Sequence, residues 1–412
     1  MQIFLVGGAV RDELLNYPSI EKDWLVVGAR AQDLLDRGYL AVGKDFPVFL
    51  HPESKEEYAL ARTERKTGPG YRGFATNADP SVTIEQDLLR RDLTINAIAK
   101  NASGELIDPY GGARDIENKW LRHISPAFAE DPVRILRVAR FAARYAHLGF
   151  TVHPSTMALM QHMVDHDEVD HLVPERIWKE LSRALGEQNP QVFIQVLRDC
   201  GALACIMLEI DNLFGVPQRA EHHPEVDCGI HTLLTLKRGS ELSTQIAVRF
   251  SCLTHDLGKA QTPRDILPRH IGHEHRSEDL VKALCQRLKI PNEIQSLALL
   301  TAKYHTQCHR AFELKPSSIL KLLEALDAFR KPQRVENFVL CCQADAQGRT
   351  GFESKPYPQA AYLQQAFASC QKISAKLFLA QGLQGKQLGT ALRAARIEAL
   401  RELRQHYSET SP

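Results

Sequence analysis

The stretch MQIFLVGGAVRDELLNYPSIEKDWLVV, residues 1–27, decides the fold of the first third of the chain. Gln2–Val6 and Asp23–Val27 are short apolar runs of the length and composition of strands. A glycine pair, Gly7-Gly8, follows the first run and precedes a helix that we expect from about Val10 to Leu15. A strand, a tight turn, a helix and a second strand predict a mixed α/β layer at the N-terminus.

The glycine pair is placed where a phosphate could approach the backbone. Glycine lacks the Cβ that would block such an approach, and the first turn of a helix offers N–H donors to an anion. Arg11, one turn into the helix, adds a cation that suits phosphate oxygens. Gly8 and Arg11 are therefore candidate nucleotide contacts, and a plain tight turn is the alternative reading.

Two carboxylates stand at the start of the second strand. Glu21 and Asp23 are two residues apart, so in a strand they point to the same face. Like charges so close are unfavourable unless a cation lies between them, and Mg²⁺ prefers carboxylates together with nucleotide phosphates. Glu21 and Asp23 are the candidate catalytic metal ligands, with Glu57 on a neighbouring strand as a third. An acidic strand end exposed to water is the alternative.

The remaining head is mixed and the rest of the chain is helical. Further strands are expected at Tyr39–Val42, Pro47–Leu50 and Tyr58–Ala61, and the glycine-containing stretch Lys66–Asp79 is expected to be a loop. From Pro126 onward apolar residues follow a helical period. The expected helices are Asp131–Tyr145, Pro174–Leu185, Pro190–Cys200, Ser240–Leu257, Ser277–Leu288, Glu293–Tyr304, Lys315–Ala328 and Gly389–Gln405.

The composition is that of an ordinary globular protein, and 412 residues exceed one core, so two or three domains are expected. The mixed head followed by helices predicts an α+β fold. The 51 basic and 50 acidic residues nearly cancel, so any nucleic-acid surface must be local. All nine cysteines follow residue 199 and form no CxxC motif, which indicates reduced thiols. No signal peptide or membrane span is present in the sequence. We therefore expect a cytoplasmic protein, either a monomer or a homodimer.

Four further motifs follow the first one in order along the chain. They are RRDLTINA at Arg90–Ala97, DPYGGARD at Asp108–Asp115, EDPVRILRVARF at Glu130–Phe141 and PERIWKE at Pro174–Glu180. Together with the glycine pair and the carboxylates, they resemble the nucleotidyltransferases of the DNA polymerase β superfamily. The resemblance is closest to the bacterial class II tRNA nucleotidyltransferases, the CCA-adding enzymes. It implies a polymerase β-like head that extends tRNA with CTP and ATP, using Mg²⁺ and no template.

The resemblance also implies roles for residues of the expected helix Asp131–Tyr145, and this sequence departs from the family pattern at one position. It implies that Asp131 and Arg134 hydrogen-bond the base edge, a task that suits a carboxylate and a guanidinium. Arg134, Arg137, Arg140 and Arg144 share about a third of the helix circumference, and an amphipathic surface helix is the alternative. Arg137 and Arg140, with Arg91 of the second motif, are further candidate nucleotide contacts. The departure is Glu21, where the family usually has Asp.

The C-terminal part carries a second candidate metal site. The sequence HDLGK, which begins at His255-Asp256, follows an apolar run, and the arrangement resembles the HD phosphohydrolase domain. The resemblance implies metal ligation by His231, His255, Asp256 and Asp345, and phosphatase and 2′,3′-cyclic phosphodiesterase activity. Imidazole and carboxylate suit Ni²⁺ or another transition metal, which would polarise a phosphoryl group. Four more histidines are possible ligands or phosphate contacts: His270, His273, His275 and His305.

The expected domains are a nucleotidyltransferase head at 1–125, an α-helical nucleotide-selection and tRNA-binding region at 126–222, an HD domain at 223–350 and a helical tail at 351–412. Alternative functions are CC-only, A-only or poly(A) addition. An HD phosphohydrolase with an RNA-binding head, and a tRNA-binding scaffold without activity, are the others. The expected loop at Lys66–Asp79 is a hypothetical element of the switch from C to A.

Overall fold

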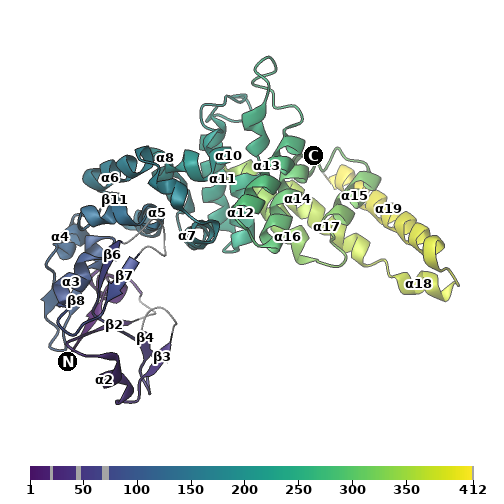
Figure 1. Cartoon of the computed structure of the whole chain (residues 1–412). Helices are drawn as coiled ribbons and strands as arrows, with labels where there is room; N and C mark the ends of the chain where they lie inside the picture. Colours follow the sequence, from purple (N-terminus) through teal and green to yellow (C-terminus); the bar gives the residue numbers. More distant parts are fainter. Residues whose placement is uncertain (19–21, 43–47, 67–73, 411–412) are drawn as a thin grey trace. The chain divides into compact units, whose positions relative to one another are not determined.

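The computed structural model describes residues 1–18, 22–42, 48–66 and 74–410. Glu21, one of the two candidate catalytic carboxylates, lies outside the described residues. The chain forms two compact units, one of Met1–Ala184 with Val192–Ile206 and one of Leu185–Gln191 with Met207–Pro412. Figure 1 labels the elements in chain order.

The first unit is built on a seven-stranded sheet in the order β3-β4-β5-β2-β1-β8-β9. Its strands are β1 (Gln2–Val6), β2 (Asp23–Val27), β3 (Leu40–Val42), β4 (Val48–Leu50), β5 (Glu57–Leu60), β8 (Ala99–Lys100) and β9 (Leu106–Ile107). Strand β2 is antiparallel to β1 and parallel to β5, so the sheet is mixed. Two small sheets pair β6 (Thr63–Lys66) with β7 (Phe74–Asn77) and β10 (Trp120–Leu121) with β11 (Thr151–Val152).

Alternation along β2 places apolar side chains on both faces of the sheet. Leu25 packs with Phe4 and Leu88 in one cluster, whereas Val26 packs with Phe49 and Leu34 in another. Successive side chains of a strand point to opposite faces, so this strand is covered on both sides. The central position of β2 fixes the place of Asp23 at its first residue.

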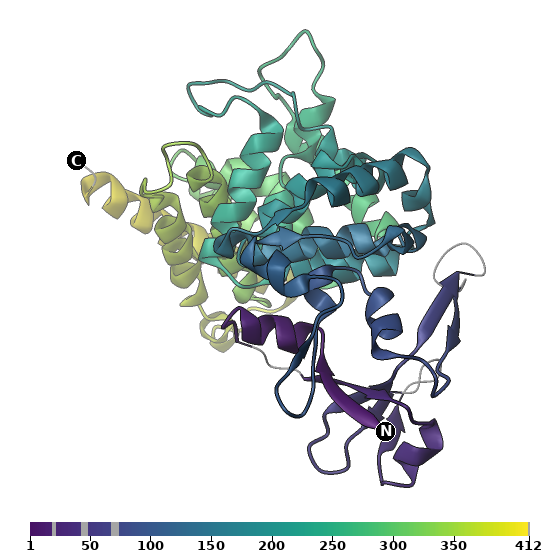
Figure 2. The same cartoon turned by 90° about the vertical axis from the view of Figure 1, so that its left-hand side faces the viewer.

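Short helices and turns connect and cover the strands. The chain can be followed in Figure 2 from the N-terminus through β1 directly into α1. The helices that begin before residue 207 are α1 (Gly8–Leu14), α2 (Ala31–Leu35), α3 (Ile84–Leu89), η1 (Thr94–Asn96), α4 (Gly112–Glu117), η2 (Pro126–Glu130), α5 (Val133–Tyr145), η3 (Ala146–Leu148), α6 (Pro154–Asp165), η4 (Glu168–His171), α7 (Pro174–Gly186), α8 (Pro190–Asp199) and α9 (Ala202–Ile206).

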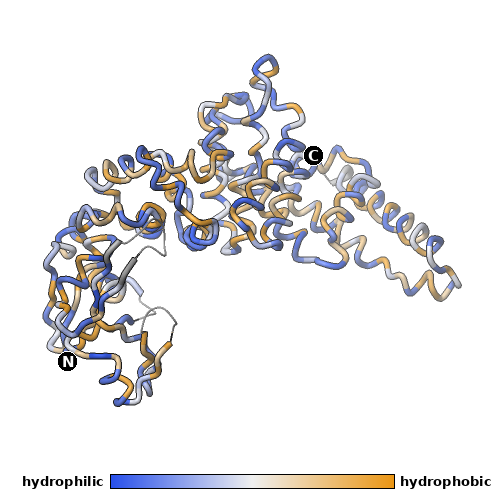
Figure 3. Tube along the Cα trace, in the orientation of Figure 1, coloured by the Kyte–Doolittle hydropathy of each residue, from blue (hydrophilic) through white to orange (hydrophobic). Residues whose placement is uncertain are grey.

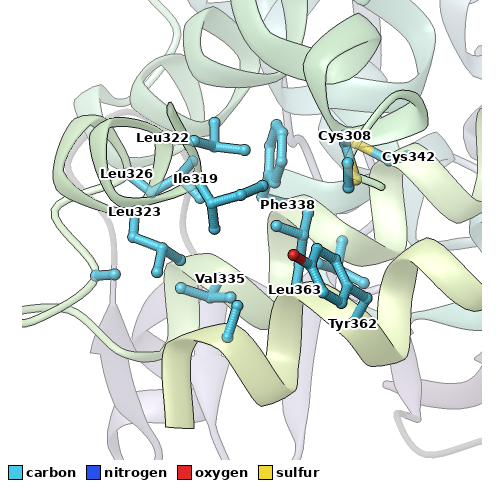
Figure 4. Close-up of a cluster of buried hydrophobic side chains, with 14 of the residues drawn as sticks. Cys308, Ile319, Leu322, Leu323, Leu326, Val335, Phe338, Cys342, Tyr362 and Leu363 are labelled. Carbon is cyan, nitrogen blue, oxygen red and sulfur yellow. The ribbon is translucent and has the colours of Figure 1, made fainter. Parts of the chain in front are cut away.

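The regular elements among the described residues of the second unit are helices, which loops connect. Its elements are α10 (Leu208–Asp211), α11 (Cys228–Leu242), α12 (Ile246–Thr254), η5 (Leu257–Gln261), α13 (His273–Arg287), α14 (Asn292–His309), α15 (Pro316–Ala325), α16 (Gln333–Gln347), α17 (Pro358–Gln371), α18 (Ala375–Ala380) and α19 (Gly385–Thr410). Figure 4 shows part of its core, where Phe338 of α16 lies among side chains of α15 and α17. The expected mixed head followed by helices is confirmed, and the fold is α+β.

The prediction of one helix over Ser240–Leu257 is wrong, because the chain breaks between α11 and α12. Arg249 of α12 stabilises the break by donating to the carbonyl oxygens of Ser243 at 2.7 Å and Ser240 at 3.0 Å. Carbonyls in the last turn of a helix have no intrahelical partner. A side chain from the next helix satisfies them here, and neither Gly nor Pro marks the site in the sequence.

The prediction of a continuous loop at Lys66–Asp79 is also wrong in part. Phe74–Asn77 forms strand β7 and pairs antiparallel with β6. Residues 67–73 lie outside the described residues. The four-residue strands, with Thr63 opposite Asn77, give this segment a hairpin stem.

All nine cysteines have free thiols, and eight of them are buried. In Figure 3 hydrophobic and hydrophilic residues are interspersed along the helices. Among the described residues, none of the helices combines the length and apolar character that crossing a membrane requires.

Candidate active sites

Two of the predicted carboxylates are neighbours across the sheet. Asp23 of β2 is the register partner of Glu57 of β5 in a parallel pair, so both side chains point to the same face. Both residues are exposed. They line a cavity of about 480 Å³, whose wall also includes Glu13, Lys22 and Glu56. The site therefore presents several carboxylates to a space large enough for a nucleotide.

The turn at the glycine pair Gly7-Gly8 packs against Arg91 of the second motif. Gly7 has a φ of +68°, and a Cβ on it would lie 2.6 Å from Nη1 of Arg91. Gly8 is the first residue of α1, and a Cβ there would lie 3.4 Å from Nη2 of Arg11. Arg91 in turn donates to Asp87 at 3.2 Å. Gly7 is thus required for the close approach of a guanidinium to the turn.

Arg11 is buried and bound within the protein, which the sequence did not indicate. Its Nε donates to Asp12 at 2.9 Å, and Nη1 donates to the side chain of Asn96. The guanidinium also lies 5.1 Å from the ring centres of Phe141 and Tyr145. These contacts tie α1 to the second motif and to α5, whereas the sequence suggested a contact with phosphate.

Helix α5 contacts the second motif through an ion pair whose carboxylate is buried. Nε of Arg137 donates to Oδ2 of Asp92 at 2.7 Å, and Asn96 donates to Oδ1 of Asp92 at 2.8 Å. Burial by itself would raise the pKa of Asp92, but Arg137, Asn96 and Arg134 outweigh it and hold that pKa well below the usual range. The carboxylate is therefore ionised, and it fixes the position of α5.

The residues expected to select the base each have a positioning partner. Both oxygens of Asp131 accept hydrogen bonds from Arg176 of α7, at 3.0 and 2.8 Å. Arg134 donates to the backbone oxygens of Ala127 at 3.0 Å and Arg90 at 2.6 Å. This network connects the second, fourth and fifth motifs of the sequence.

Arg140 is the most enclosed of the arginines on α5 that were expected to contact nucleotide. It is 7% exposed and donates to Glu180 at 2.7 Å. Its guanidinium also lies 4.4 Å from the ring centre of Phe141. The arginine face of α5 is therefore largely satisfied by carboxylates and rings of the same unit.

The four residues expected as HD metal ligands come together in the second unit. Nε2 of His231 lies 3.1 Å from Oδ1 of Asp345, and Nε2 of His255 lies 3.8 Å from the same oxygen. His255 also lies 3.1 Å from Oδ2 of Asp256. All four residues are buried, and they reach the cluster from α11, α16 and the segment that follows α12.

Histidines of α13 and α14 extend this cluster. Nε2 of His273 and Nε2 of His305 lie 3.2 and 3.4 Å from Oδ1 of Asp256. Lys259 contacts Oδ2 of the same carboxylate at 2.6 Å. Burial would raise the pKa of Asp256, but His255, Lys259 and His273 lower it well below the usual value.

The structure also separates the remaining histidines into two groups. His309, which the sequence reasoning missed, places Nε2 2.6 Å from Oδ2 of Asp345. Its spacing of four from His305 on one helix face was the available signal. His270 instead contacts Thr262 at 2.7 Å, and His275 is exposed. Neither belongs to the groups of described residues whose ligand atoms converge closely enough to hold a metal.

Two orphaned atoms show that this cluster fits a divalent metal. Nε2 of His255 and Oδ1 of Asp256 are buried, and within the described part of the chain their ion-pair contacts at 3.1–3.4 Å lack the geometry of hydrogen bonds. Leaving buried polar atoms without partners is costly, and a cation would satisfy both. The ligand atoms of His231, His255 and Asp345 converge within 4.8 Å, as do those of Asp256, His273 and His305.

A carboxylate orients His231, one of the expected HD metal ligands. Nδ1 of His231 lies 3.0 Å from Glu225, another contact that the sequence reasoning missed. A carboxylate on the second ring nitrogen fixes the tautomer and the ring plane of a metal-binding histidine.

Family comparisons match three consecutive parts of the chain. Residues 3–122 match the poly A polymerase head domain, residues 149–214 match a probable RNA- and SrmB-binding site of polymerase A, and residues 229–330 match the HD domain. The polymerase-type head and the HD domain that the sequence resembled are thus confirmed.

Curated relatives match the chain from end to end. The multifunctional CCA protein of Thioalkalivibrio sulfidiphilus is 61% identical over 407 residues, which cover 99% of this chain and 100% of the relative. That of Teredinibacter turnerae is 61% identical over 404 residues, covering 98% of each chain.

Solved structures share the fold at low identity. A CCA-adding enzyme in an apo form is 18% identical, with a TM-score of 0.67 over 100% of this chain and 92% of its own. The Thermotoga maritima CCA-adding enzyme complexed with tRNA is 17% identical, with a TM-score of 0.62 over 98% of this chain and 91% of its own.

Proposed function

This chain belongs to the family of multifunctional CCA proteins, which are CCA-adding tRNA nucleotidyltransferases with an HD domain, and we propose how its two sites divide the work. The head adds the terminal nucleotides of tRNA from CTP and ATP. The HD cluster hydrolyses phosphate esters at RNA ends. The observation that carries the first assignment is the in-register pair of Asp23 and Glu57 at the wall of a nucleotide-sized cavity.

In the transferase reaction the 3′-oxygen of tRNA forms a bond to the α-phosphorus of the incoming nucleotide. The bond from that phosphorus to the bridging oxygen breaks, pyrophosphate leaves, and the hydroxyl proton passes to solvent. Asp23 and Glu57, with Glu21 two residues before Asp23, would hold Mg²⁺, which would lower the cost of the charge that develops on the phosphate oxygens. Gly8 would let the nucleotide approach the turn before α1.

We assign the choice of base to Asp131 and Arg134. A carboxylate accepts from the exocyclic amine that cytosine and adenine share, and a guanidinium donates to ring nitrogens or carbonyls. Arg176 orients Asp131, and the Asp92–Arg137 pair holds α5 in place. On this assignment, Arg91 and Arg140 support the site, because their guanidinium groups are bound to Asp87 and Glu180.

The HD cluster is assigned to hydrolysis of phosphomonoesters and 2′,3′-cyclic phosphates. The oxygen of a water forms a bond to phosphorus, the bond from phosphorus to one ribose oxygen breaks, and that oxygen takes the proton. His231, His255, Asp256 and Asp345 would hold Ni²⁺ or another transition metal, which polarises the phosphoryl group and acidifies the water. The supporting observation is the pair of orphaned atoms on His255 and Asp256.

We further propose that the chain works in the cytoplasm and divides functionally at residues 125, 222 and 350. Residues 126–222 would hold the acceptor stem of tRNA through its shape and phosphates. The formal net charge of +1 gives no overall attraction to nucleic acid, so these contacts would depend on local positive charge.

The transferase assignment is tested by adding nucleotides to a tRNA that lacks its CCA end. Growth by three nucleotides that needs Mg²⁺, CTP and ATP together is expected, with product lengths resolved on a sequencing gel. Asp23→Ala and Glu57→Ala should each lower the rate at least about 100-fold, because a metal ligand contributes several kcal/mol. Glu117→Gln, an exposed carboxylate in the same unit, is the matched control. A full rate in Glu57→Ala would exclude it as a ligand.

The HD assignment is tested with 2′,3′-cyclic AMP and Ni²⁺. Release of a phosphomonoester by the native protein, and its loss in Asp256→Asn, are expected. Metal content measured after dialysis should fall in the same variant. A variant that hydrolyses at the native rate would move the reaction away from this cluster.

A further inference from the structure

A second cavity lies directly beside the HD cluster. Its volume is about 340 Å³, within the range of pockets that hold a small ligand. It is lined by His309, whose Nε2 contacts Asp345 at 2.6 Å, and by the segment that joins α16 to α17. The side chain of His309 therefore lies between the cavity and the proposed metal ligand Asp345.

The cations of this wall are placed for an anion near Asp345. Arg349 lies 3.4 Å from Oδ1 of Asp345, so its guanidinium faces the cluster. Its Nε is buried and has no hydrogen-bond partner among the described residues. Lys355, which is exposed, supplies a second cation to the same cavity. An ester phosphate in the cavity would pair with the guanidinium of Arg349 and with the ammonium group of Lys355.

Two aromatic residues complete the wall. The ring of Phe352 is covered on one face by Nζ of Lys355, 3.3 Å from its centre. Tyr357 contacts Nδ1 of His309 through its hydroxyl at 2.9 Å. A base can stack on an aromatic face, and such stacking contributes to nucleotide binding without selecting one base.

The backbone before this segment is fixed by close packing. A Cβ on Gly348 would lie 2.6 Å from the Cα of Thr235, so the end of α16 meets α11 too closely for a side chain. Arg349 follows at once, and its Nη1 donates to the backbone oxygen of His222 at 3.4 Å. The guanidinium is thus held by the fold before any ligand arrives.

We propose that this cavity binds the 3′-terminal nucleotide of an RNA whose phosphate is the substrate of the HD cluster. Arg349 and Lys355 contact the phosphate, and Phe352 supports the base. This inference names the substrate subsite of the proposed HD activity and rests on that proposal. It is a binding site, and it includes no chemical step beyond the one assigned to the cluster.

The test is direct binding of 3′-AMP to the full-length protein without added metal, measured by calorimetry. Arg349→Gln and Lys355→Gln should each weaken binding by roughly ten- to hundredfold, as expected when a charge-assisted hydrogen bond is lost. Phe352→Ala should weaken 3′-AMP but leave inorganic phosphate unchanged. Arg330→Gln, an exposed arginine of the same unit, should bind like the native protein. Unfolding midpoints confirm that each variant is folded.

The outcomes separate this inference from the HD assignment. Binding that is unchanged in Arg349→Gln and Lys355→Gln would overturn the subsite even if the native protein hydrolyses 2′,3′-cyclic AMP. If inorganic phosphate binds as tightly as 3′-AMP, the proposed binding of a nucleotide is wrong and the cavity is an anion site. Asp131→Ala, a variant of the head, should not affect 3′-AMP binding, and a loss there would move the bound nucleotide to the head. Native binding without hydrolysis would support the subsite and contradict the HD activity.

Discussion

Replacing Arg176 by Lys should weaken the selection of CTP and ATP without unfolding the first unit. Two nitrogens of Arg176 donate to the two oxygens of Asp131, at 3.0 and 2.8 Å. Lys keeps the positive charge but cannot form this planar fork. The carboxylate of Asp131 would then rotate, and its alignment with the exocyclic amine of the base would be lost.

The expected size of the effect follows from the exposure of the pair. The side chain of Arg176 is 25% exposed and that of Asp131 is 20% exposed, so solvent screens part of their interaction. A charge-assisted hydrogen bond contributes about 1.5–3 kcal/mol when buried, and exposure reduces this value. We expect a loss of about 1–2 kcal/mol, which is roughly a five- to thirtyfold decrease in kcat/KM.

The assay is single-nucleotide addition with each of the four nucleoside triphosphates. The value of kcat/KM should fall for CTP and ATP, and fall less for UTP and GTP, because the amine at C4 of cytosine and at C6 of adenine is replaced by a carbonyl oxygen in uracil and guanine. The double variant Asp131→Ala/Arg176→Lys should be no worse than Asp131→Ala alone if Arg176 acts through Asp131. Arg401→Lys, in an exposed ion pair, is the control. An equal decrease for all four nucleotides would refute the reasoning.

Three further outcomes are expected. Gly7→Ala should lower the unfolding free energy by roughly 1–3 kcal/mol in thermal melts, because its φ is +68° and the new Cβ meets Arg91; an unchanged midpoint would show that the turn relaxes. The pKa of Asp92 is lower in the folded protein than in the unfolded chain, where it is about 3.9, so its pairing with Arg137 stabilises the fold above about pH 5 and less at lower pH. Denaturant titrations should therefore show native stability falling between pH 5 and 3 more steeply than that of Asp92→Asn; parallel curves would contradict this. Iodoacetamide should label Cys205 first under native conditions, because it is the one exposed cysteine, and mass spectrometry of the labelled peptides would reveal any other order.

Local patterns were sufficient for five of the seven strands of the sheet that carries the proposed transferase site, and β8 and β9 were missed. Strands β1 and β2 begin and end at the predicted residues, because each is a short apolar run. The expectation that Glu57 lies on a neighbouring strand agrees with its parallel register beside Asp23. Short-range rules worked here because the deciding interactions are between residues close in sequence or on adjacent strands.

Contacts that local sequence patterns do not encode explain the features that we did not predict. The helix break between α11 and α12 depends on the side chain of Arg249, several residues further along the chain. No glycine or proline between the two helices predicts the break. Arg11 was interpreted as a phosphate contact, yet it is bound by Asn96, 85 positions away. His309 belongs to the HD cluster through Asp345, which lies 36 positions further along the chain. Such hydrogen-bond partners are brought together by the packing of the folded chain, which a local sequence motif does not specify.

The arginine face of α5 shows why this distinction matters for function. From periodicity alone, a polar stripe on a helix is equally compatible with solvent and with buried partners. Here Asp92 and Glu180 occupy that face, each paired at 2.7 Å with one of its arginines. Removing a partner from a buried ion pair leaves an uncompensated charge, so these arginines are constrained by the fold before any nucleotide binds. Arg134, to which we assign the choice of base, therefore projects from a helix that its neighbours hold in place, and preorganisation of this kind lowers the entropy cost of recognising a base without a template.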